Sequence, residues 1–351
     1  MKTRILSVRD DGIDAVSAAF SEVIESGGIA AFPTETVYGL GGNGLLASAA
    51  AKIYVAKGRP SDNPLILHIG KEEQLFPLIA EMTAEAEALI RAFWPGPLTL
   101  IFQKSEIVPR ETTGGLNTVA VRMPSDPTAH RLLMDCALPV AAPSANLSGR
   151  PSPTSFRHVK EDLFGRADLL IDGGDSAIGL ESTILDLSGQ VPTLLRPGFI
   201  TLEKLQAVIG EVQEDPVIRP EHIIAGIPAD FRPKAPGMKY RHYAPKAPLT
   251  VVRGSAAAVA EALNRIADED TGILTSEEHA ALFQKGRVLT VGRLKDPESI
   301  AHALFSTLRR FDELGVHRIY SEDFTEADIG TAVMNRLLKA AGGSVADAET
   351  L

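Results

Sequence analysis

Seven prolines between residues 211 and 248 divide this 351-residue chain into two parts. Proline fixes φ and lacks a backbone N–H, so we predict that this segment contains neither a helix nor a central strand. We expect a semi-rigid linker over 211–248, a larger domain over 1–210 and a smaller one over 249–351. The linker is not an inert spacer, because Met238–Tyr243 is basic and aromatic and loops this long are usually functional or disordered.

The composition is that of an ordinary folded protein. With 44% hydrophobic and 23% charged residues, the chain is neither collagen-like nor intrinsically disordered. Cys136 is the single cysteine, so an internal disulfide and a CxxC zinc site are both excluded. The first residues lack a signal peptide's apolar run, and no apolar stretch reaches the ~18 residues of a membrane span. We therefore expect a cytoplasmic protein without membrane contact.

The net charge of −10 gives the chain no general attraction to nucleic acid or to an anionic membrane. An anionic substrate must therefore meet a local cluster of basic residues.

Short apolar segments are mixed with helical patterns in the first part of the chain. We predict helices at 13–26, 47–56 and 83–93, and strands at 29–32, 64–69, 98–102, 119–122, 140–142, 169–172, 183–187 and 193–195. These are too many strands for simple β–α alternation, so we expect a twisted, mixed α/β sheet.

The last hundred residues follow a cleaner pattern. Predicted strands at 249–252, 272–275, 288–291 and 318–320 alternate with predicted helices near 255–267, 277–284, 299–314 and 326–341. Such alternation indicates a small Rossmann-like domain, with a parallel sheet covered on both faces.

Residues Gly39–Gly44 match the pattern G-x-G-x-x-G. A dinucleotide fingerprint must lie in the turn between a strand and its helix, and here several residues separate the preceding strand from Gly39. We interpret the segment as a glycine-rich turn in which the backbone approaches a ligand or itself closely. The chain has no Walker-type phosphate loop.

A basic cluster of Lys52, Lys57 and Arg59 lies at a predicted helix end. Favourable capping of the helix C-terminus would explain a single lysine there. Because Gly58 and Pro60 end the helix abruptly and polar residues follow, we favour a polyphosphate site.

Polar groups also follow or occupy several predicted strands. The segment Pro143–Gly149 comes directly after a buried strand, where α/β sheets place ligands, although an ordinary Asx turn is the alternative. His68 lies in an apolar strand, as a core histidine would. Arg122 ends another strand and needs a carboxylate partner from protein or ligand. Glu181 is consistent with plain strand entry, and Asp172–Asp175 favours a tight turn over a metal site.

Taken together, these motifs resemble the Sua5/YrdC/YwlC family, the threonylcarbamoyl-AMP synthases of tRNA t6A biosynthesis. The matching segments are Phe32–Leu40, Lys57–Pro60, Asn63–Leu65, Trp94–Thr99, Val121–Pro124, Pro143–Asn146, Glu181–Ile184, Arg196–Gly198 and Pro236–Pro245. The trailing domain is similar to that of the longer, two-domain Sua5 subgroup. Ala235 is a small departure from a linker motif that often has serine.

The resemblance implies that L-threonine, bicarbonate (or CO2) and ATP give threonylcarbamoyl-AMP and pyrophosphate. A partner transferase would then pass the threonylcarbamoyl group to adenosine 37 of tRNA. Such a reaction depends on cations and oriented donors more than on a nucleophilic side chain. Mg²⁺ is expected with ATP, and its protein ligands stay unknown.

The resemblance also implies roles for particular residues. Those expected at the reacting groups are Lys57, Arg59, Ser144 and Asn146. Those expected to bind ATP are Arg59, Asn63, Thr118, Ser144, Ser152, Arg196 and Tyr243, the last folding over the nucleotide from the linker. Those expected to bind threonine are Thr36, His68, Arg122, Ser182 and the backbone of Ala142.

Two other functions stay open. A duplex-RNA-binding protein would use Lys52, Lys57, Arg59 and Arg122 on phosphates, although the acidic net charge counts against it and leaves at most weak RNA binding. A carbamoyl transferase of the hydrogenase-maturation kind shares a YrdC-like domain, but it also carries a zinc-finger segment that a chain with one cysteine cannot form.

Overall fold

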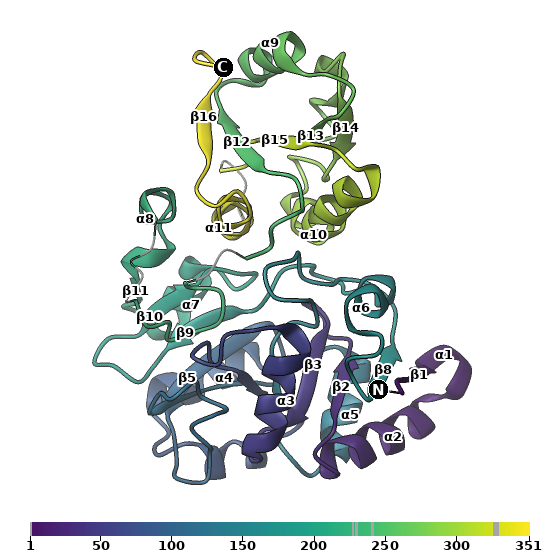
Figure 1. Ribbon diagram of the computed structural model, residues 1–351. Helices are drawn as coiled ribbons and strands as arrows, with labels where there is room; N and C mark the ends of the chain where they lie inside the picture. The colour runs from purple at the N-terminus through teal and green to yellow at the C-terminus, as the bar shows by residue number, and fades with distance from the viewer. Residues whose placement is uncertain (1, 227, 229–230, 240–241, 326–329) are drawn as a thin grey trace.

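The computed structural model describes residues 2–226, 228, 231–239, 242–325 and 330–351. It contains two sheets, an 11-stranded one in the first part of the chain and a 5-stranded one in the second (Figure 1). In the described part of the chain, no helix is long and apolar enough to cross a membrane.

The larger sheet has the order β1-β8-β2-β3-β7-β4-β6-β5-β9-β10-β11. Its strands are β1 (Arg4–Ser7), β2 (Ile29–Phe32), β3 (Gly39–Asn43), β4 (Ile66–His68), β5 (Leu98–Gln103), β6 (Thr118–Arg122), β7 (Val140–Ala142), β8 (Leu169–Asp172), β9 (Thr183–Asp186), β10 (Thr193–Arg196) and β11 (Gln213–Glu214). The sheet contains parallel pairs such as β4/β6 and antiparallel pairs such as β5/β6. The prediction of a mixed sheet is therefore confirmed.

Helices cover both faces of this sheet. They are α1 (Val8–Asp11), α2 (Ile13–Glu25), α3 (Ala47–Lys57), α4 (Ala84–Phe93), α5 (Pro127–Asp135), α6 (Phe156–Leu163) and α7 (Leu202–Ile209). Val16, Phe20 and Ile24 recur at helical spacing along α2, and together with α5 they bury one face of β2 and β8. A second, larger cluster includes side chains of α3 and α4 and fills the other face.

The prediction of a turn at Gly39–Gly44 is wrong, because residues 39–43 form strand β3 between β2 and β7. The glycines are needed because large side chains cross this strand. A Cβ added to Gly41 would lie 2.5 Å from Val140 Cγ1 and 2.8 Å from Phe32 Cε1. The sequence predicted that the backbone approaches a ligand or itself, whereas the atoms that lie against Gly41 belong to core side chains.

The linker is also more structured than its prolines suggest. It contains the edge strand β11, a 3-10 turn at Pro216–Ile218 and helix α8 at Pro220–Ala225. The prediction that it holds no helix is therefore wrong. Pro220 occupies the first helical position, where a missing N–H costs nothing. Ile223 of α8 packs into the core of the second domain.

The second sheet has the order β14-β13-β15-β12-β16, and every pair in it is parallel, as predicted. Its strands are β12 (Leu249–Arg253), β13 (Thr271–Thr275), β14 (Arg287–Thr290), β15 (Arg318–Glu322) and β16 (Val345–Asp347). Helix α9 (Ala256–Ile266) packs on one face, and α10 (Pro297–Leu314) and α11 (Gly330–Ala340) pack on the other.

The helix predicted at 277–284 is wrong. Only one 3-10 turn forms there, at Ala280–Leu282, and none of its side chains is buried. The backbone becomes extended at Phe283, so this short segment does not continue as a helix. Residues 326–329 of the helix predicted at 326–341 lie outside the described residues, and α11 begins at Gly330.

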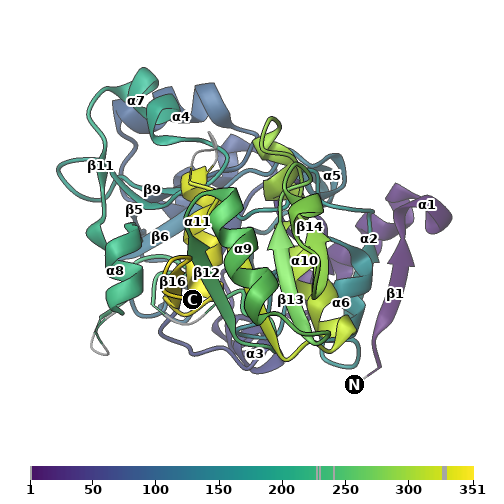
Figure 2. The same cartoon turned by 90° about the horizontal axis from the view of Figure 1, so that it is seen from above.

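Helices α10 and α11 lie between the second sheet and the first domain, while α9 lies on the far side (Figure 1). From above, the second domain covers the middle of the first (Figure 2). Val37 and Leu180 of the first domain belong to one buried cluster with Phe305 of α10 and Leu337 of α11. The close approach requires Gly179, where an added Cβ would lie 2.5 Å from His302 Cα. The two domains therefore share a core.

Candidate active site

A pocket with about 540 Å³ of unfilled space, counted to its open mouth, lies between the first domain and the linker. It is lined by Thr34, Thr36, Val37, Tyr38, Gly39, Arg59, Ile66, His68, Arg122, Ala142, Pro143, Ser144, Glu181, Ser182, Arg196, Pro236, Gly237, His242 and Tyr243. Many of these residues follow or end strands, where open sheets place their ligands.

The loop between β2 and β3 forms one wall of the pocket. Thr34 Oγ1 donates to the carbonyl of Val37 at 2.6 Å and lies 2.9 Å from Thr36 Oγ1. These local bonds fold Pro33–Val37 back on itself. The hydroxyl of Thr36 therefore has a fixed position beside the end of β6.

Arg122 anchors that wall and is almost fully buried. Its Nη1 donates to Thr36 Oγ1 at 2.8 Å, and its Nη2 forms an ion pair with Glu35 Oε1 at 2.8 Å. The carboxylate partner expected for Arg122 is thus Glu35. Burial raises the pKa of Glu35, but the Arg122 charge and hydrogen bonds outweigh it and lower the pKa overall. Nη2 carries two N–H groups, so beside its contact with Glu35 it keeps one donor for a ligand.

His68 lies opposite Arg122, with which it is in register across β4 and β6. Its Nδ1 lies 3.1 Å from the carbonyl of Ile66, and its ring meets the Phe32 edge. Burial, with a smaller contribution from the Arg122 charge, lowers the pKa of His68 to about 3. The pocket therefore presents a neutral imidazole at physiological pH. His68 is a buried core histidine and a pocket residue at once.

Arg196 and Ser182 form the facing wall. Arg196 donates from Nε to the carbonyl of Ser182 at 2.9 Å and from Nη2 to its Oγ at 3.1 Å. Ser182 Oγ also lies 2.8 Å from Thr99 Oγ1. Arg196 Nη1 reaches the carbonyl of Pro236 at 3.3 Å, which ties the linker to β10. Burial lowers the pKa of Arg196 to about 10, so it stays charged at neutral pH.

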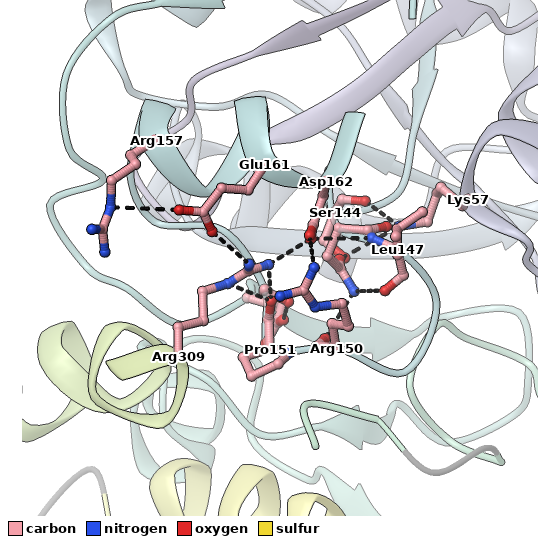
Figure 3. A network of polar contacts seen from close by, with 12 residues as sticks. Lys57, Ser144, Leu147, Arg150, Pro151, Arg157, Glu161, Asp162 and Arg309 are labelled. Atoms are coloured by element: carbon pink, nitrogen blue, oxygen red, sulfur yellow. Dashed lines mark hydrogen bonds and ion pairs between the residues drawn. The ribbon is translucent and has the colours of Figure 1, made fainter. Parts of the chain in front are cut away.

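Lys57 lies behind the pocket rather than in its lining. Its Nζ donates to the carbonyls of Ser144 and Asn146, while Ser144 Oγ donates to Asn146 Oδ1 (Figure 3). Burial lowers the pKa of Lys57 well below its ordinary value. In this structure Lys57 therefore holds the loop that brings Ser144 into the pocket.

Arg59 reaches the pocket from the end of α3. Its Nη2 lies 3.2 Å from the carbonyl of Pro64. Lys52, by contrast, is exposed and donates to the carbonyl of Gly27 at 2.6 Å. The basic cluster predicted from sequence is thus wrong for Lys52, because a separation of five residues turns it to a different side of the helix from Lys57.

Two linker residues close the pocket on the side of the second domain. Tyr243 has φ +67°, and its ring stacks on Phe305 of α10 with 5.1 Å between the ring centres. His242 Nε2 is buried and has no hydrogen-bond partner in the described part of the chain. Burial also lowers the pKa of His242 well below its ordinary range. Tyr240 and Arg241 of the basic, aromatic motif lie outside the described residues.

The second domain contributes polar side chains that sequence reasoning missed. Arg336 of α11 donates from Nε to Glu181 Oε2 at 2.9 Å, and Ser152 Oγ donates to Glu181 Oε1. Lys339 Nζ donates to the carbonyl of Gly237 at 2.7 Å. Arg336 and Lys339 are buried side chains of a helix in the second domain. Their place at the site is therefore evident only from the way the two domains pack together.

Helix α10 supports the Ser144 loop in a similar way. Arg309 Nη2 donates to the carbonyl of Pro151 and to Asp162 Oδ2, both at 2.7 Å. Asp162 also accepts from Leu147 N at 3.3 Å and pairs with Arg150. Figure 3 shows this chain of contacts running from α10 to Ser144 and Lys57.

The structure brings together many of the residues that the sequence indicated. Those that line the pocket are Arg59, Ser144, Arg196, Tyr243, Thr36, His68, Arg122, Ala142 and Ser182. Those that do not are Lys57, Asn63, Thr118, Asn146 and Ser152. Thr118 begins β6, which Arg122 ends, about 13 Å away along a strand. Asn63 is buried, and its Oδ1 has no hydrogen-bond partner among the described residues.

The acidic segment after β8 gathers no three metal-ligating side chains in the described residues. Gly174 N donates to Asp172 Oδ1 at 3.1 Å, and the carbonyl of Gly174 accepts from the Tyr38 hydroxyl at 2.5 Å. The backbone of residues 173–176 is irregular, so the prediction of a tight turn at Asp172–Asp175 is wrong, and side-chain contacts hold the segment instead.

Two family profiles match the chain along most of its length. The Sua5/YciO/YrdC profile, which is described as telomere recombination, matches residues 22–198. A profile described as the C-terminal domain of threonylcarbamoyl-AMP synthase matches residues 200–342.

Individual proteins agree with these profiles. The chain is 47% identical to the threonylcarbamoyl-AMP synthase of Pyrococcus abyssi, over 91% of this chain and 92% of that protein. It is 45% identical to the Bacillus subtilis threonylcarbamoyl-AMP synthase, over 97% and 96% of the two chains.

The crystal structure of P. abyssi Sua5 complexed with L-threonine superposes with a TM-score of 0.87 at 44% identity, covering 99% of both chains. On these matches in sequence, domain order and fold, the chain belongs to the threonylcarbamoyl-AMP synthase family, in its two-domain Sua5 form.

Proposed function

We propose that this protein is an L-threonylcarbamoyladenylate synthase, a nucleotidyltransferase that joins L-threonine, bicarbonate or CO2, and ATP. The products are threonylcarbamoyl-AMP and pyrophosphate. The observation that carries the proposal is the gathering of three buried guanidinium groups, those of Arg59, Arg122 and Arg196, around one pocket with a neutral histidine. Such a pocket suits two anionic substrates that have to react with each other.

Arg122 would bind the threonine carboxylate. Its Nη2 has the spare donor, and Glu35 and Thr36 hold the guanidinium in place. The hydroxyls of Thr36 and Ser182 and the backbone of Ala142 would bind the polar groups of the amino acid, with neutral His68 beside them. The P. abyssi relative complexed with L-threonine supports threonine as a substrate.

Arg59, Ser144 and Arg196 would bind ATP, with Tyr243 folded over the nucleotide. Lys57 would offset phosphate charge, and a bound triphosphate would restore the ammonium that burial disfavours. Four residues expected to act on ATP or at the reacting groups do not line the pocket in this structure: Asn63, Thr118, Asn146 and Ser152. We propose that they act on ATP by positioning other groups or after the pocket has opened.

The reaction would proceed in two steps. The threonine amine attacks the carbon of CO2, or of bicarbonate with loss of water, and its nitrogen loses a proton as the N-carboxylate forms. A carboxylate oxygen then attacks the α-phosphorus of ATP, and the bond to the bridging oxygen breaks so that pyrophosphate leaves. Arginine side chains would stabilise the charge on the phosphoryl oxygens.

Mg²⁺ would be bound mainly by the phosphates of ATP. In the part of the chain that the structure describes, no three metal-ligating side chains gather. This donor set suits a hydrated Mg²⁺ that enters with the nucleotide, because that ion keeps several waters and needs few protein ligands. When bound, the ion would neutralise charge on the phosphates as pyrophosphate leaves.

The cytoplasm is the proposed location, and a tRNA threonylcarbamoyl transferase is the proposed consumer of the product. The test of the synthase is pyrophosphate release by the full chain with ATP, threonine and bicarbonate. We expect release to require threonine and to be lost in Arg59→Ala. Release that continues without threonine, or tight duplex-RNA binding that weakens steeply with salt, would favour the other candidate functions.

A further inference from the structure

We propose that Arg309, in α10 of the second domain, is a positioning residue for ATP binding, which acts through Asp162 on the Ser144 loop (residues 144–151). The inference rests on the proposed function, because it concerns how tightly the same pocket binds ATP. Ser144 lines that pocket, whereas Arg309 and Asp162 do not. The contacts between Arg309 and the loop therefore connect the second domain to the nucleotide end of the site.

Asp162 is the centre of the contacts that hold the loop. It lies on α6, and its side chain is fully buried. Its Oδ2 accepts from Leu147 N at 3.3 Å, and its Oδ1 accepts from Arg150 Nη1. Both donors belong to the loop, so the carboxylate fixes the loop through its backbone and through a charged side chain.

Asn146 connects these contacts to Ser144. Its Nδ2 donates to the carbonyl of Leu147 at 2.8 Å and to that of Arg150 at 2.9 Å. Its Oδ1 accepts from Ser144 Oγ at 2.5 Å (Figure 3). The position of the Ser144 hydroxyl therefore depends on the same two residues that Asp162 holds.

Arg309 supplies the contact from the second domain. It is buried, and its Nη2 donates to Asp162 Oδ2 and to the carbonyl of Pro151, both at 2.7 Å. Its Nε donates to the same carbonyl at 3.2 Å. One guanidinium thus holds the carboxylate and the far end of the loop together. Without Arg309, Asp162 and the Pro151 carbonyl would each lose a buried charged donor, and the loop would be held less firmly.

The threonine end of the pocket is held by different contacts. Arg122 is fixed by Glu35 and Thr36, which belong to the loop between β2 and β3. Loss of Arg309 should therefore weaken the binding of ATP and change that of threonine much less. A general loss of folding would instead weaken the binding of both.

The test measures the dissociation constants of Mg²⁺-ATP and of L-threonine by calorimetry on the full chain. Each substrate is added alone, so that no adenylate can form. We expect Arg309→Ala to weaken ATP binding about tenfold or more, with a much smaller change for threonine. Arg310→Ala is the matched control, because this exposed neighbour pairs with Glu313, and it should change neither constant. Equal weakening of both substrates, or no change in either, would overturn the proposal.

Two further variants test whether Arg309 acts through Asp162. Arg309→Ala should weaken ATP binding much less in an Asp162→Asn background than in the wild type, whereas fully additive effects would contradict the proposed route. Arg309→Lys keeps a charge beside Asp162 but lacks the fork that also holds Pro151. It should keep the fold and still weaken ATP binding more than threonine binding, so the test stands if Arg309→Ala does not fold.

Hydrogen exchange of the loop amides, that of Leu147 among them, adds a readout that needs no substrate. Exchange should be faster in Arg309→Ala than in the wild type and in Arg310→Ala, and unchanged exchange would show that Arg309 does not hold the loop. A wild-type chain that binds no ATP would overturn the proposed function and this inference with it. A wild-type chain that binds ATP no more tightly than Arg309→Ala would overturn this inference alone.

Discussion

Arg336 of α11 lies 2.9 Å from Glu181 of the first domain, measured from Nε to Oε2, and both side chains are buried. Arg336 also donates from Nη1 to the carbonyl of Pro197 at 2.8 Å. Because Glu181 lines the candidate active site, the second domain forms part of the wall behind the pocket rather than an independent appendage.

Removing one partner of this pair should destabilise the whole chain. Arg336→Ala leaves Glu181 charged and buried, and breaking a buried ion pair in this way costs about 3–5 kcal/mol. Chemical denaturation with probes in each domain measures the loss. Arg310→Ala breaks the exposed pair with Glu313 and should have a much smaller effect. Equal stability of the two variants would show that the buried pair does not link the domains.

The ion pair of Glu35 with Arg122 should make stability fall in acid. The folded pKa of Glu35 is below its ordinary value of 4.5, so the stabilisation is complete above that value and is lost as the pH falls through the folded pKa. From about pH 5 to pH 3, the wild-type free energy of unfolding should therefore fall more steeply than that of Glu35→Gln. Parallel pH profiles would show that this carboxyl does not carry the effect.

Lys339 should make the free energy of unfolding depend on pH in the neutral to alkaline range, whereas Glu35 does so in acid. Burial lowers the pKa of Lys339 from 10.5 to about 7, so between these values the unfolded chain binds more protons than the folded one. The free energy of unfolding should rise with pH across that window, and below about pH 7 the contribution of Lys339 should be constant. Lys339→Met should flatten the rise between pH 7 and about pH 9. An unchanged slope in the variant would assign the rise to another group.

Substrate binding should depend on the shape of the Arg122 side chain as well as its charge. Lysine cannot hold Thr36, Glu35 and a ligand at once, because it lacks the planar fork of arginine. Arg122→Lys should therefore raise KM for threonine about tenfold or more and change KM for ATP much less. Arg91→Lys, at an exposed position on α4, is the control. Equal changes in both KM values would remove Arg122 from the threonine end of the pocket.

The packing around β3 predicts a position that does not tolerate a methyl group. In Gly41→Ala, the new Cβ would meet Val140 Cγ1 at 2.5 Å, and such overpacking costs about 1–3 kcal/mol. Gly189→Ala is the matched control, because the nearest atom is 3.8 Å away. Thermal unfolding compares the two. A Gly41→Ala protein as stable as Gly189→Ala would mean that the neighbouring side chains move aside freely.

Local sequence patterns predicted those helices and strands whose own residues show a clear apolar run or amphipathic spacing. Strand β2 and strand β8 begin and end where the apolar runs indicate, and α2 follows its amphipathic spacing. The prediction of a turn at Gly39–Gly44 failed because glycine is ambiguous. It marks a turn when φ is positive, and a close approach when distant side chains such as those of Phe32 and Val140 cross the strand.

Sequence reasoning identified much of the site and missed its support from the second domain. Arg122 and Ser144 stand beside strand ends, a position that a sequence pattern can reveal. Arg336 and Lys339 lie more than 100 residues from the groups that they contact. Nothing in their own helix indicates those partners, because the contacts depend on how the two domains dock.

One measurement tests most directly whether a single pocket joins all three substrates. The full chain is incubated with ATP, L-threonine and ¹³C-bicarbonate, and the nucleotides are analysed by mass spectrometry. The account predicts threonylcarbamoyl-AMP carrying one labelled carbon, formed together with pyrophosphate. Hydrolysis of ATP without a labelled adenylate, or an adenylate that carries no label, would contradict it.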